Sequence, residues 1–211
     1  MNKILNCFFD CLNENEPSSI NFFQENRIDP NSKYVVCGIV FAAINKSYFD
    51  LAKLIVSDDL FNANDAIDVL GEPLICKVAW SIPGAKDAKL VEKYYDFIRF
   101  CIKSGKFDLN VKDTNLDSVV NILAQWSTSE EFKMLIANPN VNLNLVNDIE
   151  CTALTNALRF DRVENVKLLA ARGDLIVRPI DVVIADKHNI DLQTFGYKVP
   201  NVTDSERQFY S

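Results

Sequence analysis

A short apolar pattern that returns at a fixed interval is the feature that most constrains this chain. Its clearest copy predicts an apolar helix from Thr152 to Phe160 and a second helix from Val163 to Ala171, separated by the turn Asp161-Arg162. Gly173 follows at the position where a left-handed residue commonly ends a helix. Two short helices with a connecting loop cannot bury their apolar face alone, so the unit needs similar neighbours.

The same unit recurs along the chain in three matched columns of residues. Successive first-helix positions are 34, 46 and 34 residues apart, successive second-helix positions 46, 34 and 34, and successive closing asparagines 33, 46 and 34. The longer interval places twelve extra residues between the two helices of the second full unit. The columns are Val40, Leu74, Val120 and Leu154 in the first helices, Ala52, Ile98, Phe132 and Val166 in the second helices, and Asn31, Asn64, Asn110 and Asn144 in the loops.

Five phrases in these units resemble the ankyrin repeat family over roughly residues 18–191. They are similar to its T-P-L-H opening, its second helix and its Asp/Asn-rich closing loop. The chain departs from the family at the histidine of the opening, so the hydrogen bond of that histidine is lost or replaced. The phrases are Glu72-Pro73-Leu74, Thr152-Ala153-Leu154, 28–31, 107–113 and 163–169, and the histidine position holds Phe41, Ile75, Asn121 and Thr155.

The resemblance implies an all-α fold: an ankyrin-type helical repeat solenoid whose helix pairs are joined by finger loops. Tetratricopeptide repeats have a similar period, but their helix pairs lack a long Asp/Asn-rich loop. We expect one domain over residues 1–211, because each unit packs only on its neighbours. Its parts are an N-terminal cap (1–30), four repeats (31–64, 65–110, 111–144 and 145–177), a C-terminal cap (178–191) and a tail (192–211).

Both ends of the chain are predicted to cover the stack. At the N-terminus we expect helices 3–13 and 18–26 around a turn at Pro17, with Ser18 or Ser19 as the N-cap. The run 4–12 is too polar for a signal peptide, and no stretch approaches the ~20 apolar residues of a membrane span. At the C-terminus we expect a short helix 181–188, followed by a tail that is packed down or disordered.

The extra residues of the second unit lie in the stretch 81–96. Pro83-Gly84 predicts a turn, after which a lengthened second helix would run to Ser104 before Gly105. The alternative is an added recognition element, whose lysines Lys86, Lys89 and Lys93 would form a locally basic face on an acidic protein.

Charge and cysteine usage exclude several function classes. The formal charge of −7 argues against a nucleic-acid partner, which requires clustered Lys and Arg. The six cysteines are interpreted as free, mostly buried thiols in a reducing compartment. Cys7 and Cys11 have the spacing of a partial metal site, but His188 is the only histidine, so we expect no metal and no cofactor.

The sequence contains none of the common catalytic motifs, including a phosphate-binding glycine loop or a G-x-S-x-G elbow. The resemblance then implies a non-catalytic monomer that binds another protein, with a basic or partly apolar surface, through its concave face and finger loops. Such a protein would be cytoplasmic, or in a host cytosol if translocated. The alternatives are a bacterial effector or toxin-neutralising (immunity-type) ankyrin protein, a structural spacer, and an enzyme with a site in the 81–96 insertion.

The predicted partner-binding residues form a column and a set of loop positions. The column lies six residues after each first-helix anchor, where the family's inner helix ends on its concave side. One interpretation is that its aromatic rings stack on each other and close the helix turns. The other is an apolar binding centre with a polar rim. The column is Lys46, Trp80, Trp126 and Phe160, and the loop residues are Tyr34, Asp68, Asn115, Asp117, Asp148 and Glu150.

Overall fold

The computed structural model describes the backbone of residues 3–34, 37–126 and 130–210. Contacts between residues divide the chain into two compact units, Met1–Asp108 and Leu109–Ser211, and each is described by itself. Among the described residues, the regular secondary structure consists of helices and one hairpin with two residues in each strand, which confirms the predicted all-α class.

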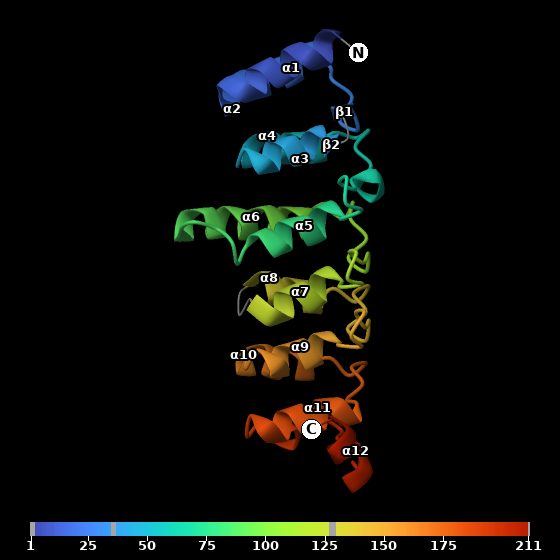
Figure 1. Ribbon diagram of the computed structural model, residues 1–211. Coiled ribbons are helices and arrows are strands. Elements are labelled where there is room, and N and C mark those ends of the chain that lie inside the picture. Colours follow the sequence, from blue (N-terminus) through green and yellow to red (C-terminus); the bar gives the residue numbers. More distant parts are fainter. Residues whose placement is uncertain (1–2, 35–36, 127–129, 211) are drawn as a thin grey trace. The chain divides into compact units, whose positions relative to one another are not determined.

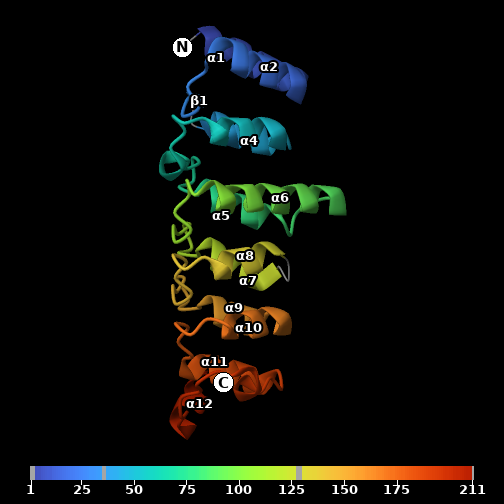
Figure 2. The same ribbon diagram turned by 180° about the vertical axis from the view of Figure 1, so that it is seen from behind.

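Unit 1 contains three layers of paired helices, drawn in blue to green in Figure 1. The loops that join one pair to the next follow one edge of the unit, and Figure 2 shows the same edge from behind. The antiparallel hairpin pairs Lys33 with Gly38 and Tyr34 with Cys37. The elements are α1 (Lys3–Glu14), α2 (Glu16–Asn26), β1 (Lys33–Tyr34), β2 (Cys37–Gly38), α3 (Ile39–Asn45), α4 (Phe49–Ser57), the 3-10 turn η1 (Ala63–Asp65), α5 (Leu74–Ser81) and α6 (Ala88–Ser104).

Unit 2 contains two helix pairs and a C-terminal group, drawn in yellow-green to red. Its loops again follow one edge of the unit. The third group begins like a pair, but its second member is a single 3-10 turn, as expected for a unit that ends an array. The elements are α7 (Val119–Trp126), α8 (Glu130–Ala137), α9 (Ala153–Arg159), α10 (Val163–Ala170), α11 (Pro179–Lys187), η2 (Leu192–Phe195) and α12 (Asp204–Tyr210).

The two helical columns of the sequence form the centre of the packing. Every member of the first-helix column and of the second-helix column is at most 2% exposed. In unit 2, α9 packs against α7, α10 and α11, so Leu154 lies between neighbouring layers. The predicted register of the helices is therefore confirmed.

The loops repeat one hydrogen-bonded geometry. In three of the loops between helix pairs, the side-chain oxygen of an Asp or Asn accepts the backbone N–H groups two and four residues later, at distances of 2.8 to 3.2 Å. The residue three positions later has a positive φ, between 60° and 86°. The sequence columns did not include this position. The accepting residues are Asp68, Asp113 and Asn147, and those with positive φ are Gly71, Leu116 and Glu150.

Three of the four asparagines of the loop column bond to the loop of the following layer. Asn144 donates from Nδ2 to the carbonyl of Asp174 and accepts the N–H of Ile176, both at 2.8 Å. Asn110 bonds in the same way to Asn140 and Asn142, and Asn31 to Leu60 and Asn62. A side-chain amide can satisfy a donor and an acceptor at once, which explains why asparagine recurs here.

Two local predictions are wrong. Helix α2 begins at Glu16 instead of Ser18, because Asn15 is the N-cap and its side chain accepts the N–H of Ser18 at 2.9 Å. Pro17 lies in the first turn, where its missing N–H has no helical acceptor to lose. Gly173 does not have a left-handed φ. The N–H groups of residues 171 and 172 instead continue the turn of α10 by bonding to the carbonyls of residues 168 and 169.

The insertion forms a loop and the first turns of a long helix, as predicted. Helix α6 has 17 residues, starts after the N-cap Asp87 and ends at Gly105, whose φ is 67°. The Nζ atom of Lys93 lies 5.8 Å from the centre of the Phe49 ring.

The tail is packed in part, since Tyr197 is buried and its hydroxyl donates to the carbonyl of Val166 at 2.5 Å.

The five cysteines whose side chains are described are thiols that form no disulfide bond with one another. Cys76, Cys101 and Cys151 are buried, while Cys7 and Cys11 are half-buried in α1. Burial raises the pKa of the Cys101 thiol well above its usual value. These side chains therefore pack as small apolar groups.

Candidate functional site

The aromatic column of unit 2 forms a ring pair at the ends of α7 and α9. Trp126 is the last residue of α7, and Phe160 directly follows α9 as its C-cap residue. Their ring centroids are 5.3 Å apart with an angle of 51° between the planes. Phe160 keeps 40% of its surface exposed and Trp126 is half-buried. The rings thus contact each other and also present an apolar edge to solvent.

One polar atom in this pair is unsatisfied. The indole Nε1 of Trp126 is buried and has no hydrogen-bond partner among the described residues. A buried donor without an acceptor costs about 1–3 kcal/mol of stability. Within the described residues this unpaired donor lowers the stability of the fold, and because the atom is buried, a partner could reach it only after the end of α7 moved.

The turn after α9 fixes the ring pair in place. Asp161 has a φ of 52°, which lets the N–H of Arg162 bond back to the carbonyl of Ala157 at 2.7 Å. The Arg162 Nε atom then donates to the carbonyl of Gln125 at 2.8 Å, next to Trp126. The two helix ends are held together through this arginine.

The column members in unit 1 lie in different surroundings. Lys46 is the C-cap residue of α3 and is exposed on the wall of a groove of about 570 Å³ between α1 and α3. Trp80 is half-buried in α5. The side chain of Tyr34 lies outside the described residues.

The predicted loop residues divide into buried and exposed groups. Asp68 takes part in the loop geometry and in an ion pair of 3.3 Å with Lys77. Burial opposes its ionisation, but the N–H groups of Glu72 and Leu70 together with Lys77 outweigh that effect and lower the pKa of its carboxyl group. Asn115, Asp148 and Glu150 are exposed.

Asp117 is 4% exposed, and its carboxylate lies against Asn147 of the following loop. Burial raises the pKa of its carboxyl group to about 6, and the nearby charges of Asp113 and Asp148 act in the same direction. The Nδ2 atom of Asn147 donates to it at 3.1 Å. A partner could reach the Asp117 carboxylate only after this loop opened.

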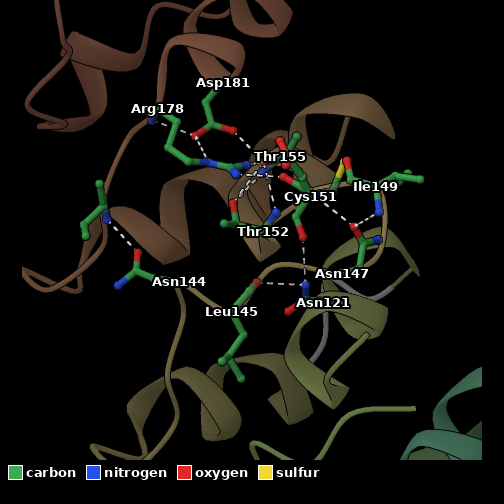
Figure 3. Close-up of polar contacts among 12 residues, drawn as sticks. Asn121, Asn144, Leu145, Asn147, Ile149, Cys151, Thr152, Thr155, Arg178 and Asp181 are labelled. Carbon is green, nitrogen blue, oxygen red and sulfur yellow. Dashed lines mark hydrogen bonds and ion pairs between the residues drawn. The ribbon is translucent and has the colours of Figure 1, made fainter. Parts of the chain in front are cut away.

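A buried polar network joins the loops to α9 and α11, and Figure 3 shows how its side chains converge. The Thr155 hydroxyl donates to Asp181 and receives the Arg178 Nη2 group, both at 2.6 Å. Burial raises the pKa of the Asp181 carboxyl group, and this effect exceeds the lowering of the pKa by the hydrogen bonds from Thr155 and Arg178. Asn121 donates to the carbonyls of Leu145 and Cys151 at 3.1 and 3.0 Å. These groups fix the positions of loops, and Asp181 is inaccessible to a substrate.

The aromatic pair and the loop residues of unit 2 form two separate patches. The loop that carries Asn115 immediately precedes α7, whereas Trp126 is at the other end of that helix. A helix of eight residues is roughly 12 Å long. The carboxylates therefore do not surround the rings as a continuous rim.

Sequence reasoning missed the exposed apolar side chains of the loops. Among the large apolar residues of the described chain that are exposed, seven lie in the loops between one helix pair and the next. Aligning the loops on Asp68, Asp113 and Asn147 places several of them at the tips. They are Leu60, Ile67, Val69 and Leu70 in unit 1 and Leu116, Ile149 and Ile176 in unit 2.

No protein-family model matches this sequence, and no curated protein is significantly similar to it. In the described ranges, no three acidic, cysteine or histidine side chains are arranged to hold a metal ion. None of the helices that the structure describes combines the length and the apolar character of a membrane span.

Proposed function

We propose that this chain is a non-catalytic protein-binding module built as an ankyrin-type helical repeat solenoid. The observation that carries the proposal is the repeated loop. Its Asp or Asn side chain, its residue with positive φ and the asparagine bonds to the next layer recur with the period of the buried helical columns. Rigid repeated loops beside exposed apolar groups are suited to hold a partner with little ordering on binding.

The histidine column of the ankyrin family contains other residues here, and in unit 2 they make bonds between layers. Asn121 reaches the carbonyls of the following loop, and Thr155 bonds to Asp181 and Arg178 of the next layer. These bonds favour an ankyrin-type arrangement in which the histidine is replaced by different polar groups.

The aromatic pair supplies a first contact surface for the partner. Trp126 and Phe160 are both partly exposed, and the buried indole N–H of Trp126 has no acceptor among the described residues. Aromatic side chains of this kind provide much of the binding energy at protein interfaces. Loss of the Trp126 ring should therefore weaken binding more than it weakens folding.

The test uses the tagged full chain in affinity capture from its source cell, or from a host cell, with quantification by mass spectrometry. We expect Trp126→Ala to weaken capture by about 2 kcal/mol, roughly 30-fold, with little change in melting temperature. Trp126→Phe removes the unpaired N–H and keeps a ring, so it should weaken capture less and leave the fold at least as stable. Phe209→Ala is the matched control, because Phe209 is an exposed aromatic residue of α12 outside the predicted column.

Two results would contradict the proposal. Equal losses of stability and capture in Trp126→Ala would make Trp126 a residue of the core. A Trp126→Ala, Phe160→Ala double variant provides the second comparison. If no captured protein is more abundant with the wild-type chain than with this variant, the chain is better explained as a structural spacer.

A further inference from the structure

The loop edge of unit 2 presents three apolar side chains to solvent. Leu116, Ile149 and Ile176 are 47%, 58% and 62% exposed. Each lies in a different loop, and the first two loops are joined by a hydrogen bond of 2.9 Å from the N–H of Asp148 to the carbonyl of Asn115. Leu116 and Ile149 directly follow these two bonded residues. In Figure 3 the Ile149 side chain points away from the polar network beneath it.

The backbone at each of these tips is held by a hydrogen bond. The N–H of Leu116 donates to the carbonyl of Asp113 at 3.0 Å. The N–H of Ile149 donates to Asn147 Oδ1 at 3.2 Å, and that of Ile176 to Asn144 Oδ1 at 2.8 Å. The three side chains are therefore presented from fixed positions, which reduces the entropy lost when a partner binds.

Leu116 has a backbone conformation that does not favour leucine. Its φ is 60°, and the corresponding residue in the loop of unit 1 is Gly71, with a φ of 86°. Left-handed backbone is unfavourable for a residue with a Cβ and a bulky side chain. Because the side chain is also about half exposed, its burial offsets little of this cost, which favours a role in binding over a role in packing.

The charges beside these tips are acidic. Asp148 and Glu150 flank Ile149 and are exposed, and neither carboxylate forms an ion pair within the described residues. The basic side chains of the same edge are occupied. Lys112 donates to the carbonyl of Val146, and Arg178 bonds to Glu150 O, Thr155 and Asp181. An approaching molecule therefore meets exposed apolar tips with two unpaired carboxylates, Asp148 and Glu150, beside Ile149.

We infer that this edge, defined by Leu116, Ile149, Ile176, Asp148 and Glu150, binds a segment of a partner protein in which apolar side chains alternate with Lys or Arg. The inference rests on the proposed protein-binding function and names the surface and the chemistry of its partner. A second copy of this chain is disfavoured as the occupant, because two copies with a formal charge of −7 repel each other.

The experiment measures binding of a synthetic peptide to the full chain by fluorescence anisotropy. The probe is a capped, dye-labelled peptide of about ten residues, long enough in extended form to span several loops, in which Lys alternates with Leu. One control peptide replaces Lys by Glu and another replaces Leu by Ser. We expect binding to the first peptide alone, weakening as salt screens the charges.

Protein variants separate the apolar and charged contributions. Leu116→Gly with Ile149→Ser should raise the Kd about tenfold or more, equivalent to 1.4 kcal/mol, while the melting temperature stays close to that of the wild type because glycine suits the φ of residue 116. Asp148→Asn with Glu150→Gln should weaken binding and reduce its salt dependence. Phe209→Ser is the matched control, because Phe209 is exposed but lies in α12, outside the loop edge.

Three outcomes would overturn the inference. The first is binding of the control peptides as tightly as the Lys-Leu peptide, or of none of the peptides. The second is an equal loss of binding in Phe209→Ser and in the loop variant. The third is a loss of binding in Trp126→Ala alone, which would move the site to the aromatic pair and leave the proposed function intact. Sedimentation of the chain without peptide would reveal a dimer if a second copy occupied the edge.

Discussion

Asp117 should make the stability of unit 2 depend on pH, with unfolding becoming easier as pH rises. Its carboxyl group is buried, and its pKa is raised from 3.8 to about 6. A group with a raised folded pKa contributes stability that is fully present below its unfolded pKa and is lost as pH rises through its folded pKa. A difference of about two pH units corresponds to roughly 3 kcal/mol, so the native state should lose up to that amount between pH 4 and pH 7.

The Asp117→Asn variant removes the titration and retains the shape. The amide oxygen can still accept the Nδ2 donor of Asn147, which bonds to the carboxylate at 3.1 Å. We therefore expect the variant to match the wild type near pH 4 and to be more stable by up to about 3 kcal/mol at pH 7. Glu150→Gln is the matched control, because it removes one carboxylate from an exposed position of the neighbouring loop.

The assay follows unit 2 alone through its single tryptophan. The chain has two tryptophans, Trp80 in unit 1 and Trp126 in unit 2, so a Trp80→Phe background leaves Trp126 as the reporter. Urea unfolding of both proteins at several pH values from 4 to 8 gives the free energy of unfolding at each pH. If the free energy of unfolding depends on pH in the same way in the wild type and in Asp117→Asn, ionisation of Asp117 does not destabilise the folded loop.

Two further stability changes follow from the packing. Leu154→Ala, at a fully buried position between layers, should cost about 2–5 kcal/mol, and a change within experimental error in urea unfolding would show that the helical register is wrong. Arg172→Met should cost about 2 kcal/mol, because the guanidinium group donates to the carbonyls of Ile136, Asn138 and Val141 at and beyond the end of α8, and these carbonyls would lose a charged donor. Thermal unfolding followed by circular dichroism measures that loss, and Lys167→Met, on an exposed helix face, should change the melting temperature little.

The amino-acid sequence by itself determined the helices and their register. Apolar residues with helical spacing, returning at intervals of 34 and 46, placed Leu74, Val120 and Leu154 at equivalent positions, and all three are buried. Such periodicity can be recognised in the sequence because the apolar face of a short amphipathic helix must be buried, and this requirement does not depend on which element packs against it. The long second helix also followed from the extra residues and from Gly105 at its end.

The N-cap residue and the exposed loop residues could not be predicted from the sequence pattern, because several neighbouring residues are suited to the same position. Asn15, Ser18 and Ser19 are all good N-caps, and only the backbone conformation selects Asn15. The exposure of Leu116 and Ile149 was not predictable from their apolar character, which usually indicates burial.

The tertiary structure alone decided how the candidate binding residues are grouped. The sequence placed Asp117 among the surface residues of a finger loop, but its carboxylate is buried against Asn147 of the following loop, and burial raises its pKa to about 6. The sequence also placed the aromatic column and the carboxylates side by side, whereas α7 holds them at its opposite ends. Position in a repeat fixes which layer a residue belongs to. Which side chains face solvent is decided by bonds between layers, such as those of Asn110 and Asn144, whose partners lie about thirty residues away.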